Sequence, residues 1–458
     1  MVGRAAGKRR PEMRRSAGMT LVEIMITLII SSIIAASTFM FFSGQQRVYE
    51  TQTKILNIQQ NLWASMEVLA RYVRGAGSGM YECVRPADYS NTDPTNPNSL
   101  TGGRLQTTTP SDGPHTSGGV LITSLATRPQ TGLRAFDGAS GMQWIPPLWI
   151  VNNSSVDANV VPGTDIITVA FGNRASGADV DGVLQLNVGV AETDPSIPIT
   201  LTGATAGSVF RLNECLLLML GQDWGYGNDP SADRGCTLLQ VTNNPGVGNI
   251  LWHASGAGVS AWNPTGTVAA MLPPGGGYTG GVDGVRNFGA LTWVRFFIQN
   301  DPNTIASANP VPQLMMQRLD QGVAGTAQAL ADGIEDLQVS FACDVGTLGT
   351  PNLNALNGIL DEGTDVASRK NDEWINNVPG DVFPTNPFTL GFCNMPTAVR
   401  LTLVARSTTP DDLIDVAVTN NQPEPVEDNP CAAAACPKDQ YRRRVLSTTV
   451  YPRNNKPL

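Results

Sequence analysis

The strongest pattern in the chain is a long apolar run near its start. Residues from Met19 to Phe42 are almost all apolar, and Glu23 is the one charged residue among them. The run from 19 to 42 is 24 residues long, which is enough to span a bilayer as a helix. A carboxylate within hydrocarbon is costly, so Glu23 predicts a function at that position.

The apolar run continues into a segment with helical periodicity. Its apolar residues recur at steps of three, four and seven, which places most of them on one helical face. They are Val48, Ile55, Ile58, Leu62, Met66, Leu69 and Val73. No proline falls between Met19 and Arg85, and glycines 75, 77 and 79 end the pattern. The sequence predicts one helix from Met19 to about Arg74, roughly 84 Å long, with a soft point at Ser43–Gly44.

Beyond Gly75 the pattern changes to short β-like runs separated by turn residues. The predicted strands are Val120–Leu125, Asp165–Phe171, Val183–Val188, Val209–Leu220, Thr237–Thr242, Leu291–Gln299, Gln313–Leu319, Ile334–Ala342, Ala398–Ser407 and Val445–Tyr451. The predicted long loops are Pro86–Pro114, Asn263–Gly284, Gly346–Pro387 and Asn420–Lys438. The fold class is therefore α+β, with a long N-terminal helix whose amphipathic half packs on a β-rich head.

Composition and charge narrow the function classes. Charged residues make up only 15% of the chain, with 47 Gly and 32 Pro, which favours a turn-rich β protein. The net charge of −9 argues against a general nucleic-acid surface. Six basic residues precede the apolar run, and positive charge at one end of a span keeps that end cytoplasmic. They are Arg4, Lys8, Arg9, Arg10, Arg14 and Arg15.

All seven cysteines follow the apolar run, on the side expected to face the periplasm, where disulfides are permitted. Cys431 and Cys436 are close enough in sequence to pair across a short loop. Two further candidate pairs are Cys215 with Cys236 and Cys343 with Cys393. Because seven is odd, one cysteine stays free, Cys83 or another. No Cys-x-x-Cys spacing occurs, so zinc and thioredoxin-like chemistry have little support.

The junction before the apolar run carries a more specific signal. Gly18-Met19-Thr20-Leu21-Val22-Glu23 resembles the class III leader junction of type IV prepilins. In that family a membrane peptidase cuts after the glycine and methylates the new N-terminus, which would here be Met19. Glu23 matches the family's glutamate at the fifth mature position. Met19 replaces the family's usual Phe, and a start at Met13 would give a leader of more typical length.

Two simpler interpretations of the same segment compete with the prepilin one. A secretory signal cleaved near Ala35-Ala36-Ser37 would have too long an apolar core and would contain Glu23. A plain membrane anchor explains the length but not the residues around Gly18.

A narrower resemblance runs along the chain. Leu56–Cys83 is similar to the start of the PilW family of minor pilins, with its Leu-Ala-Arg and Arg-x-Ala-Gly pattern. Pro162–Val169 resembles a Gly-Ser-Asp strand of that family, and Ala331–Val339 resembles a late strand entry. Segments 398–407 and 444–454 resemble its last two strands. Each motif is weak alone, and their order along the chain makes them more specific.

Catalytic and metal-binding patterns are poor. His115 and His253 lie in Gly/Ser-rich surroundings, where loop or structural roles are the simpler interpretation. Gly275–Gly280 matches G-x-G-x-x-G without the strand and helix that dinucleotide binding needs. Asp179–Gly182, and Asp229 with Asp233, lack the spacing of a known calcium loop. Arg442-Arg443-Arg444 is interpreted as a solvated strand start, or less simply as a contact with a neighbouring subunit. No enzyme activity, cofactor or metal is predicted.

The sequence thus predicts assembly rather than catalysis. The predicted parts are a leader at 1–18, a transmembrane and filament-core helix at 19–43, an amphipathic helix half at 44–75 and a β-rich head at 76–458. The resemblance implies a minor pilin that primes type IV pilus assembly, with the prepilin peptidase, other minor pilins and the major pilin as partners. Before assembly it would lie in the inner membrane with a periplasmic head, and afterwards in the pilus.

Three alternatives remain open. A J-type pseudopilin of type II secretion shares the leader, the long helix and a β head. A tip adhesin would use the unmatched loops to bind a surface or glycan. A secreted enzyme anchored by one helix would need a convergent polar site, which the sequence does not show.

Overall fold

The structure is a computed structural model, and it describes the N-terminal helix together with segments of the head. The described residues are 19–79, 106–107, 133–137, 141–145, 147–151, 159–173, 184–190, 196–198, 210–220, 236–243, 250–252, 260, 262–263, 282–307, 309–320, 325–342, 374–375, 397–411, 414 and 439–452. The chain divides into two compact units, residues 1–56 and residues 57–458. The second unit, called the head unit below, includes the last part of the helix.

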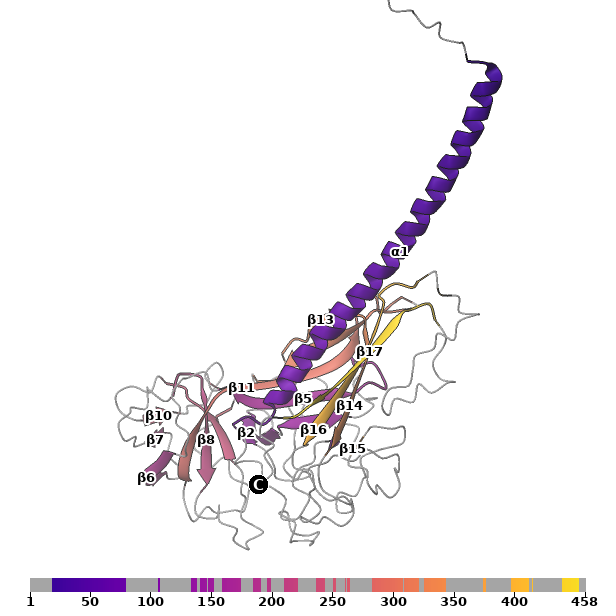
Figure 1. Cartoon of the computed structure of the whole chain (residues 1–458). Helices are drawn as coiled ribbons and strands as arrows, with labels where there is room; N and C mark the ends of the chain where they lie inside the picture. The colour runs from indigo at the N-terminus through magenta and orange to yellow at the C-terminus, as the bar shows by residue number, and fades with distance from the viewer. Residues whose placement is uncertain are drawn as a thin grey trace, which may run out of the picture. The chain divides into compact units, whose positions relative to one another are not determined.

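The predicted long helix is confirmed as α1, Leu21–Gly75, a single helix of 55 residues (Figure 1). It begins and ends within two residues of the prediction and continues without a break through Ser43–Gly44. The helix is long and apolar enough to cross a membrane. In the first unit its apolar side chains are exposed, Leu21, Leu28 and Phe39 among them.

The head is built from β-strands, as predicted. The strands are β1 (Gln106–Thr107), β2 (Leu133–Asp137), β3 (Gly141–Ile145), β4 (Leu148–Val151), β5 (Ile166–Asn173), β6 (Leu184–Val190), β7 (Ser196–Pro198), β8 (Cys215–Leu220), β9 (Cys236–Gln240), β10 (Ile250–Trp252), β11 (Val282–Asn300), β12 (Pro312–Arg318), β13 (Gln328–Asp332), β14 (Ile334–Ala342), β15 (Trp374–Ile375), β16 (Ala398–Arg406) and β17 (Arg443–Val450).

These strands form three sheets in the described residues. An 11-stranded sheet has the main order β1-β4-β5-β11-β8-β9-β2-β3, with β12 and β6 also paired to β11 and β13 paired to β12. A 4-stranded sheet has the order β15-β14-β16-β17, and β7 pairs with β10. Figure 1 shows β14, β16 and β17 side by side. Most pairs are antiparallel; β1 with β4 and β2 with β9 are parallel.

Strand β11 connects the two ends of the large sheet. Its residues 290–296 pair with β5 and residues 294–300 with β12, whereas residues 282–289 pair with β8. The register shifts between Asn287 and Gly289, and Gly289 has a φ of 76°. A bulge with a left-handed glycine bends a strand and increases its twist. One strand of 19 residues can therefore serve both halves of the sheet.

The main core lies between α1 and the sheets. Ile58, Leu62, Met66, Leu69 and Val73 from the helix pack in one cluster with β4, β5, β11, β12, β14, β16 and β17. The buried face of the helix begins at Ile58, whereas Val48 of the predicted series is exposed. Side chains alternate along β11, so Val294 and Phe296 join this cluster and Trp293 joins a second cluster with Trp262.

The glycines that end the helix permit a close approach to β5. The N–H of Gly77 donates to the Ala170 carbonyl at 2.9 Å, and the N–H of Gly172 donates to the Ser78 carbonyl at 2.8 Å. Gly79 has a φ of 81°. A Cβ at Gly172 would lie 2.3 Å from the Phe288 carbonyl oxygen. The Arg-x-Ala-Gly pattern thus marks the point where the helix joins the sheet.

Several strand predictions need correction, and others lie outside the described residues. Val209–Leu220 was too long, because a turn with Asn213 at a φ of 69° delays β8 to Cys215. The predicted loop Asn263–Gly284 overlaps the start of β11 at Val282, and β1 and β15 lie inside two other predicted loops. The predicted strand Val120–Leu125 and the loop Asn420–Lys438 lie outside the described residues.

Candidate processing and assembly site

The first turn of α1 is organised by Thr20 and Glu23. The backbone N–H of Thr20 donates to Glu23 Oε2 at 2.8 Å, and the Thr20 hydroxyl donates to the same oxygen at 3.1 Å. In return, the N–H of Glu23 donates to Thr20 Oγ1 at 3.3 Å. This reciprocal pair is a capping box, which satisfies backbone donors that a helix leaves unpaired at its start.

The capping box fixes an exposed carboxylate at the end of an apolar helix. Helix N-termini favour negative charge, because the peptide dipoles place partial positive charge there. Glu23 is thus held in position, and a carboxylate so placed can accept hydrogen bonds from an ammonium group. Gly18, the residue before the predicted cut, lies outside the described residues.

In the head, two motif segments that are far apart in sequence meet at Asp165. The N–H of Asp165 donates to the Leu337 carbonyl at 2.8 Å, and the N–H of Val339 donates to Asp165 Oδ2 at 2.7 Å. Gln338 Nε2 donates to the Gly163 carbonyl at 3.0 Å, where Gly163 has a φ of 85°. Asp165 is fully buried. The segment entering β5 is therefore joined to β14 of the other sheet.

From the sequence, Asp165 is only the first residue of a predicted strand. The visible signal was one acidic residue directly before the apolar run from Ile166 to Phe171. A buried carboxylate requires partners, so an acidic residue at a strand entry can indicate a junction. Its partner strand could not be read from the sequence.

The basic run Arg442–Arg444 is not simply a solvated strand start. Arg443 is mostly buried and makes two bidentate contacts, with Glu335 at 2.7 and 3.0 Å and with Asp439 at 2.7 and 2.5 Å. Glu335 belongs to β14 and Arg443 to β17, so the guanidinium joins the two strands that flank β16. Two-point contacts of this kind are stronger than single neutral hydrogen bonds.

Burial and hydrogen bonding have opposite effects on the pKa of Asp439, and likewise on the pKa of Arg443. Burial raises the pKa of Asp439, but hydrogen bonds from Arg443 and from the Tyr441 backbone outweigh it, so the pKa lies below its ordinary value. Burial lowers the pKa of Arg443, but hydrogen bonds to Asp439 and Glu335 outweigh it and raise the pKa above its ordinary value. The carboxylate of Asp439 therefore stays ionised in the folded head at neutral pH.

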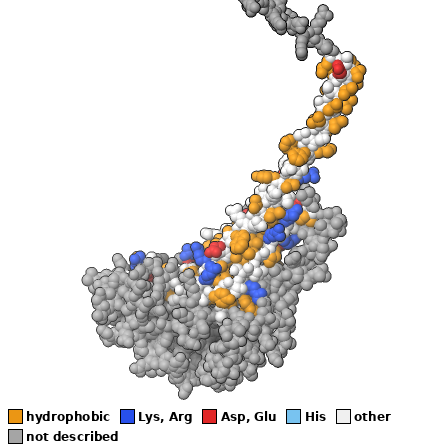
Figure 2. All heavy atoms as spheres, in the orientation of Figure 1, with side chains coloured by type: hydrophobic (Ala, Val, Ile, Leu, Met, Phe, Trp, Pro, Cys, Tyr) orange, Lys and Arg blue, Asp and Glu red, His pale blue; other side chains and the backbone are white. Residues whose placement is uncertain are grey.

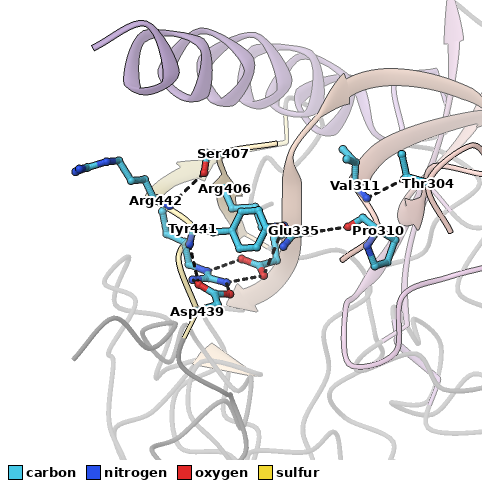
Figure 3. Close-up of polar contacts among 10 residues, drawn as sticks. Thr304, Pro310, Val311, Glu335, Arg406, Ser407, Asp439, Tyr441 and Arg442 are labelled. Atoms are coloured by element: carbon cyan, nitrogen blue, oxygen red, sulfur yellow. Dashed lines mark hydrogen bonds and ion pairs between the residues drawn. The ribbon is translucent and has the colours of Figure 1, made fainter. Parts of the chain in front are cut away.

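The neighbouring arginines extend the network. The Arg406 guanidinium donates to the Pro310 carbonyl and lies 4.2 Å from the centre of the Tyr441 ring (Figure 3). Arg442 forms an ion pair with the buried Asp411. Also, the N–H of Asp411 donates to the Gln440 carbonyl at 2.8 Å, and Gln440 Nε2 donates to the Ile414 carbonyl at 3.4 Å. Asp411 and Ile414 are thus held against residues 440–442.

One candidate disulfide, Cys215 with Cys236, lies within the described residues. This disulfide is not formed. Cys215 is a free, buried thiol. Its register partner on β9 is Gln240, four residues from Cys236, so the two Cα atoms are separated by about 13 Å along the strand. Burial raises the pKa of the Cys215 thiol to about 12. Cys83, Cys343, Cys393, Cys431 and Cys436 lie outside the described residues.

Other candidates also fall outside the described part of the chain. They are His115, His253, Gly275–Gly280, Asp179–Gly182, Asp229 and Asp233. Among the residues that the structure describes, no group of three or more His, Cys, Asp or Glu side chains could hold a metal ion.

Two models of known protein families match parts of this chain. Residues 13–39 match the prokaryotic N-terminal methylation motif, which defines a prepilin-type protein with a membrane-anchoring apolar helix. Residues 295–454 match the type IV pilus-assembly protein W, PilW. The chain is therefore similar to PilW over residues 295–454 and to prepilins at its N-terminus. No curated protein and no solved structure matches it.

The two matches fall on the two features described above. The methylation motif covers the capping box, and the PilW match covers the end of β11 and all of β12 to β17, including the Arg443 network. Both families are structural components of pilus assembly rather than enzymes. The protein is therefore associated with type IV pili as a minor-pilin-like subunit, processed by a prepilin peptidase.

Proposed function

We propose that this protein is a minor pilin that primes type IV pilus assembly and sits at the pilus tip. The observation that supports this most is the combination of a prepilin-type first helix with a PilW-type β domain in one chain. The helix packs among other pilin helices, and the β domain forms the head.

In this proposal, processing and assembly use the same short segment. The peptidase cuts after Gly18 and releases the α-amine of Met19. That ammonium then pairs with Glu23 or with the corresponding glutamate of a neighbouring subunit. Opposite charges in a low-dielectric core are strongly favoured over either charge alone, so the pairing sets subunit register.

The size of the head supports a position at the tip. The predicted head spans residues 76–458, and a unit of this size repeated at every position of a thin filament would crowd its neighbours. At the tip the crowding is relieved. The leader end would face the cytoplasm and the head the periplasm before assembly, with residues 19–43 in the inner membrane.

Quantitative proteomics of purified pili tests the tip position. The expected ratio of this chain to the main pilin is far below one. A ratio near one would overturn the tip proposal. The match of residues 295–454 to PilW favours a pilus over a secretion system, so the ratio should be measured in sheared type IV pili.

N-terminal mass spectrometry tests the processing step. The expected mature chain begins at Met19 and carries an N-methyl group. An uncut chain, or one that begins after Ser37, would contradict the proposal.

Replacement of the carboxylate tests the assembly role. Glu23→Ala should leave membrane insertion intact, because it removes a charge from an apolar run, and should lower recovery in sheared pili at least tenfold. Glu50→Ala, on the same helix beyond the apolar run, is the matched control and should assemble normally. Normal recovery of Glu23→Ala would show that this carboxylate does not determine assembly.

A further inference from the structure

Strand β17 forms one edge of the 4-stranded sheet. Its residues Arg443–Val450 pair with β16 without a shift in register. Among the strands that the structure describes, no other strand pairs with β17, which is yellow in Figure 1. Helix α1 also exposes hydrophobic side chains (Figure 2), but the proposed assembly already uses them. The outer edge of β17 is a separate feature of the head, which the proposed function does not use.

The backbone of β17 alternates between two sides. The N–H of Ser407 donates to the Arg442 carbonyl at 2.9 Å, so the backbone groups of Arg442 point toward the β16 side. In an antiparallel pair, every second residue points its N–H and C=O groups away from the partner strand. Val445, Ser447 and Thr449 therefore direct their backbone groups to the outside. In the part of the chain that the structure describes, no other segment forms a hydrogen bond with these groups.

The side chains of this edge do not protect it from pairing. Residues 445–450 read Val-Leu-Ser-Thr-Thr-Val, with no charged residue, proline or glycine. Val445, Ser447 and Thr449 are all exposed. Native proteins interrupt exposed edges with lysine, proline, bulges or short strands. Uncharged segments of about six residues with high β-propensity are, in contrast, the ones that pair readily with another strand.

The edge strand β13 of the large sheet has such protection. It has five residues, and its pairing with β12 shifts in register between Leu314 and Met315. Its last residue is the charged Asp332, and the Asn61 side chain donates to the Asp332 carbonyl at 3.0 Å. A short and bulged edge with a charge at its end offers an added strand little to pair with. Two edges of one head therefore differ, and only β17 of the two is suited to accept a strand.

The chemistry of the β17 edge indicates its occupant. Backbone donors and acceptors that repeat along a strand are matched by an extended polypeptide, which adds to the sheet edge through main-chain hydrogen bonds. Arg444 is exposed and has no carboxylate partner among the described residues, so an acidic residue in the added strand would complement it. A second copy of this chain would instead bring its own run Arg442–Arg444 to the same edge. The favoured occupant is therefore an extended segment of a different protein.

We propose that the edge of β17 accepts an extended segment from the head of a different pilus subunit, which adds a strand to the small sheet. The added strand bonds to the outward backbone groups of Val445, Ser447 and Thr449 and places an acidic residue beside Arg444. The proposal rests on the proposed function, because it requires a second subunit in the same assembly. It assigns a partner contact to the head, whereas the pairing of Met19 with Glu23 concerns the helix alone.

Photo-crosslinking in cells that assemble pili tests the proposal directly. The full chain would carry p-benzoyl-phenylalanine at position 445 or 449 of β17, with positions 328 and 330 of β13 as matched controls. The side chains at all four positions are exposed. The expected result is an adduct with another chain that bears a prepilin-type N-terminus, at least tenfold stronger from 445 and 449. Mass spectrometry of the adduct should place the crosslink in the partner's head, close to an acidic residue.

Several outcomes would overturn the proposal. Equal yields from β13 and β17, an adduct with a second copy of this chain, or a crosslink to the partner's long helix rather than its head would each contradict it. Absence of the chain from sheared pili would refute the proposed function and this proposal together. Presence in pili without an adduct from 445 or 449 would refute strand addition at β17 alone.

A pair of double variants provides a second measurement. Val445→Lys with Thr449→Lys places two charges on the edge, which discourages strand addition. This variant should lower recovery in sheared pili at least tenfold relative to the membrane pool, whereas Gln328→Lys with Leu330→Lys should leave recovery unchanged. Both variants should keep the melting temperature of the head, because all four side chains are exposed. Normal recovery of the Val445/Thr449 variant would contradict the proposal.

Substitution of Arg444 tests the predicted charge of the partner. Arg444→Glu should lower recovery in sheared pili, because it would repel an acidic residue in the added strand. Arg444→Lys keeps the positive charge and should restore recovery. Equal recovery of these two variants would contradict the acidic partner.

Discussion

The two ends of helix α1 have opposite surroundings. Between Leu21 and Leu56 no described side chain is buried, although most of the first half is apolar. From Ile58 to Val73 the apolar side chains are buried in the core of the head. Both parts belong to one uninterrupted helix.

The difference shows which part of the helix has its packing partners within the same chain. The C-terminal part is stabilised by β4, β5, β11 and the other strands of the main core. The N-terminal part exposes apolar surface that lipid or other helices must cover, because large exposed apolar patches are otherwise unfavourable in water. Substitutions in the first part should affect assembly, and those in the second should affect folding.

The largest expected effect comes from charge in the buried part. Leu62→Asp with Leu69→Asp would place two carboxylates in the core, and the head should lose several kcal/mol of unfolding free energy. Denaturant unfolding of the purified protein measures the loss. The matched control is Gln59→Asp with Gln60→Asp on the exposed side, which should stay within about 0.5 kcal/mol of the parent. Equal losses in both variants would contradict the burial of this face.

A smaller effect is expected at the junction between the sheets. Asp165→Ala removes the acceptor for the buried N–H of Val339, which should cost about 1–3 kcal/mol. Asp332→Ala, an exposed position on β13, is the control. Unfolding of the two variants by denaturant should differ by at least about 1 kcal/mol; an equal stability would mean that Asp165 does not join the sheets.

The Arg443 network predicts a pH-dependent contribution of similar or smaller size. Arg443→Met should destabilise the head by about 1–2 kcal/mol at pH 7, because two partly exposed carboxylates lose the guanidinium that they share. The pKa of Asp439 is lowered in the folded head, so its stabilisation is present above the ordinary Asp pKa of about 3.9 and is lost as pH falls through the folded value. The stability difference between parent and variant should therefore shrink below about pH 4.

Stability curves at several pH values provide the measurement. Arg444→Met, at an exposed position next to Arg443, is the control and should show a small difference at every pH. A difference for Arg443→Met that stays constant from pH 7 to pH 3 would contradict the assigned role of Asp439.

The smallest effect should follow from removing the N-terminal part of the helix. A chain that begins at Tyr49 keeps every helical residue of the main core, since that core starts at Ile58. Its head should unfold at a denaturant midpoint close to that of the full chain in the same detergent. A large decrease would show that residues before Tyr49 stabilise the head.

The sequence predicted the helix and the last strands well for a simple physical reason. Local periodicity determines them: α1 matches within two residues, and β14 matches Ile334–Ala342 at both ends. The capping box was not predicted, although its signal, Thr20 and Glu23 at a spacing of three, is visible in the sequence. The family resemblance identified the same N-terminal motif that the methylation model matches.

Other features depended on contacts between distant residues. Gly284 ended a predicted loop, yet it lies in β11, because a bulge allows glycine inside a long strand. β13 was missed since it has only five residues, which are mostly exposed and lack the apolar alternation of a half-buried strand. The partners of Arg443 lie at Glu335 and Asp439, and no local pattern shows that Glu335 is two strands away. The Cys215 register likewise emerged only from strand pairing.

The hydrogen bonds and the ion pair that join Asp411 and Ile414 to residues 440–442 have a consequence for the length of chain that separates them. They hold Ile414 close to Gln440, beside the pairing of β16 with β17. Closing a segment of twice the length costs only about 0.6 kcal/mol more. A change in the number of residues between Ile414 and Asp439 should therefore leave the register of this strand pair unchanged.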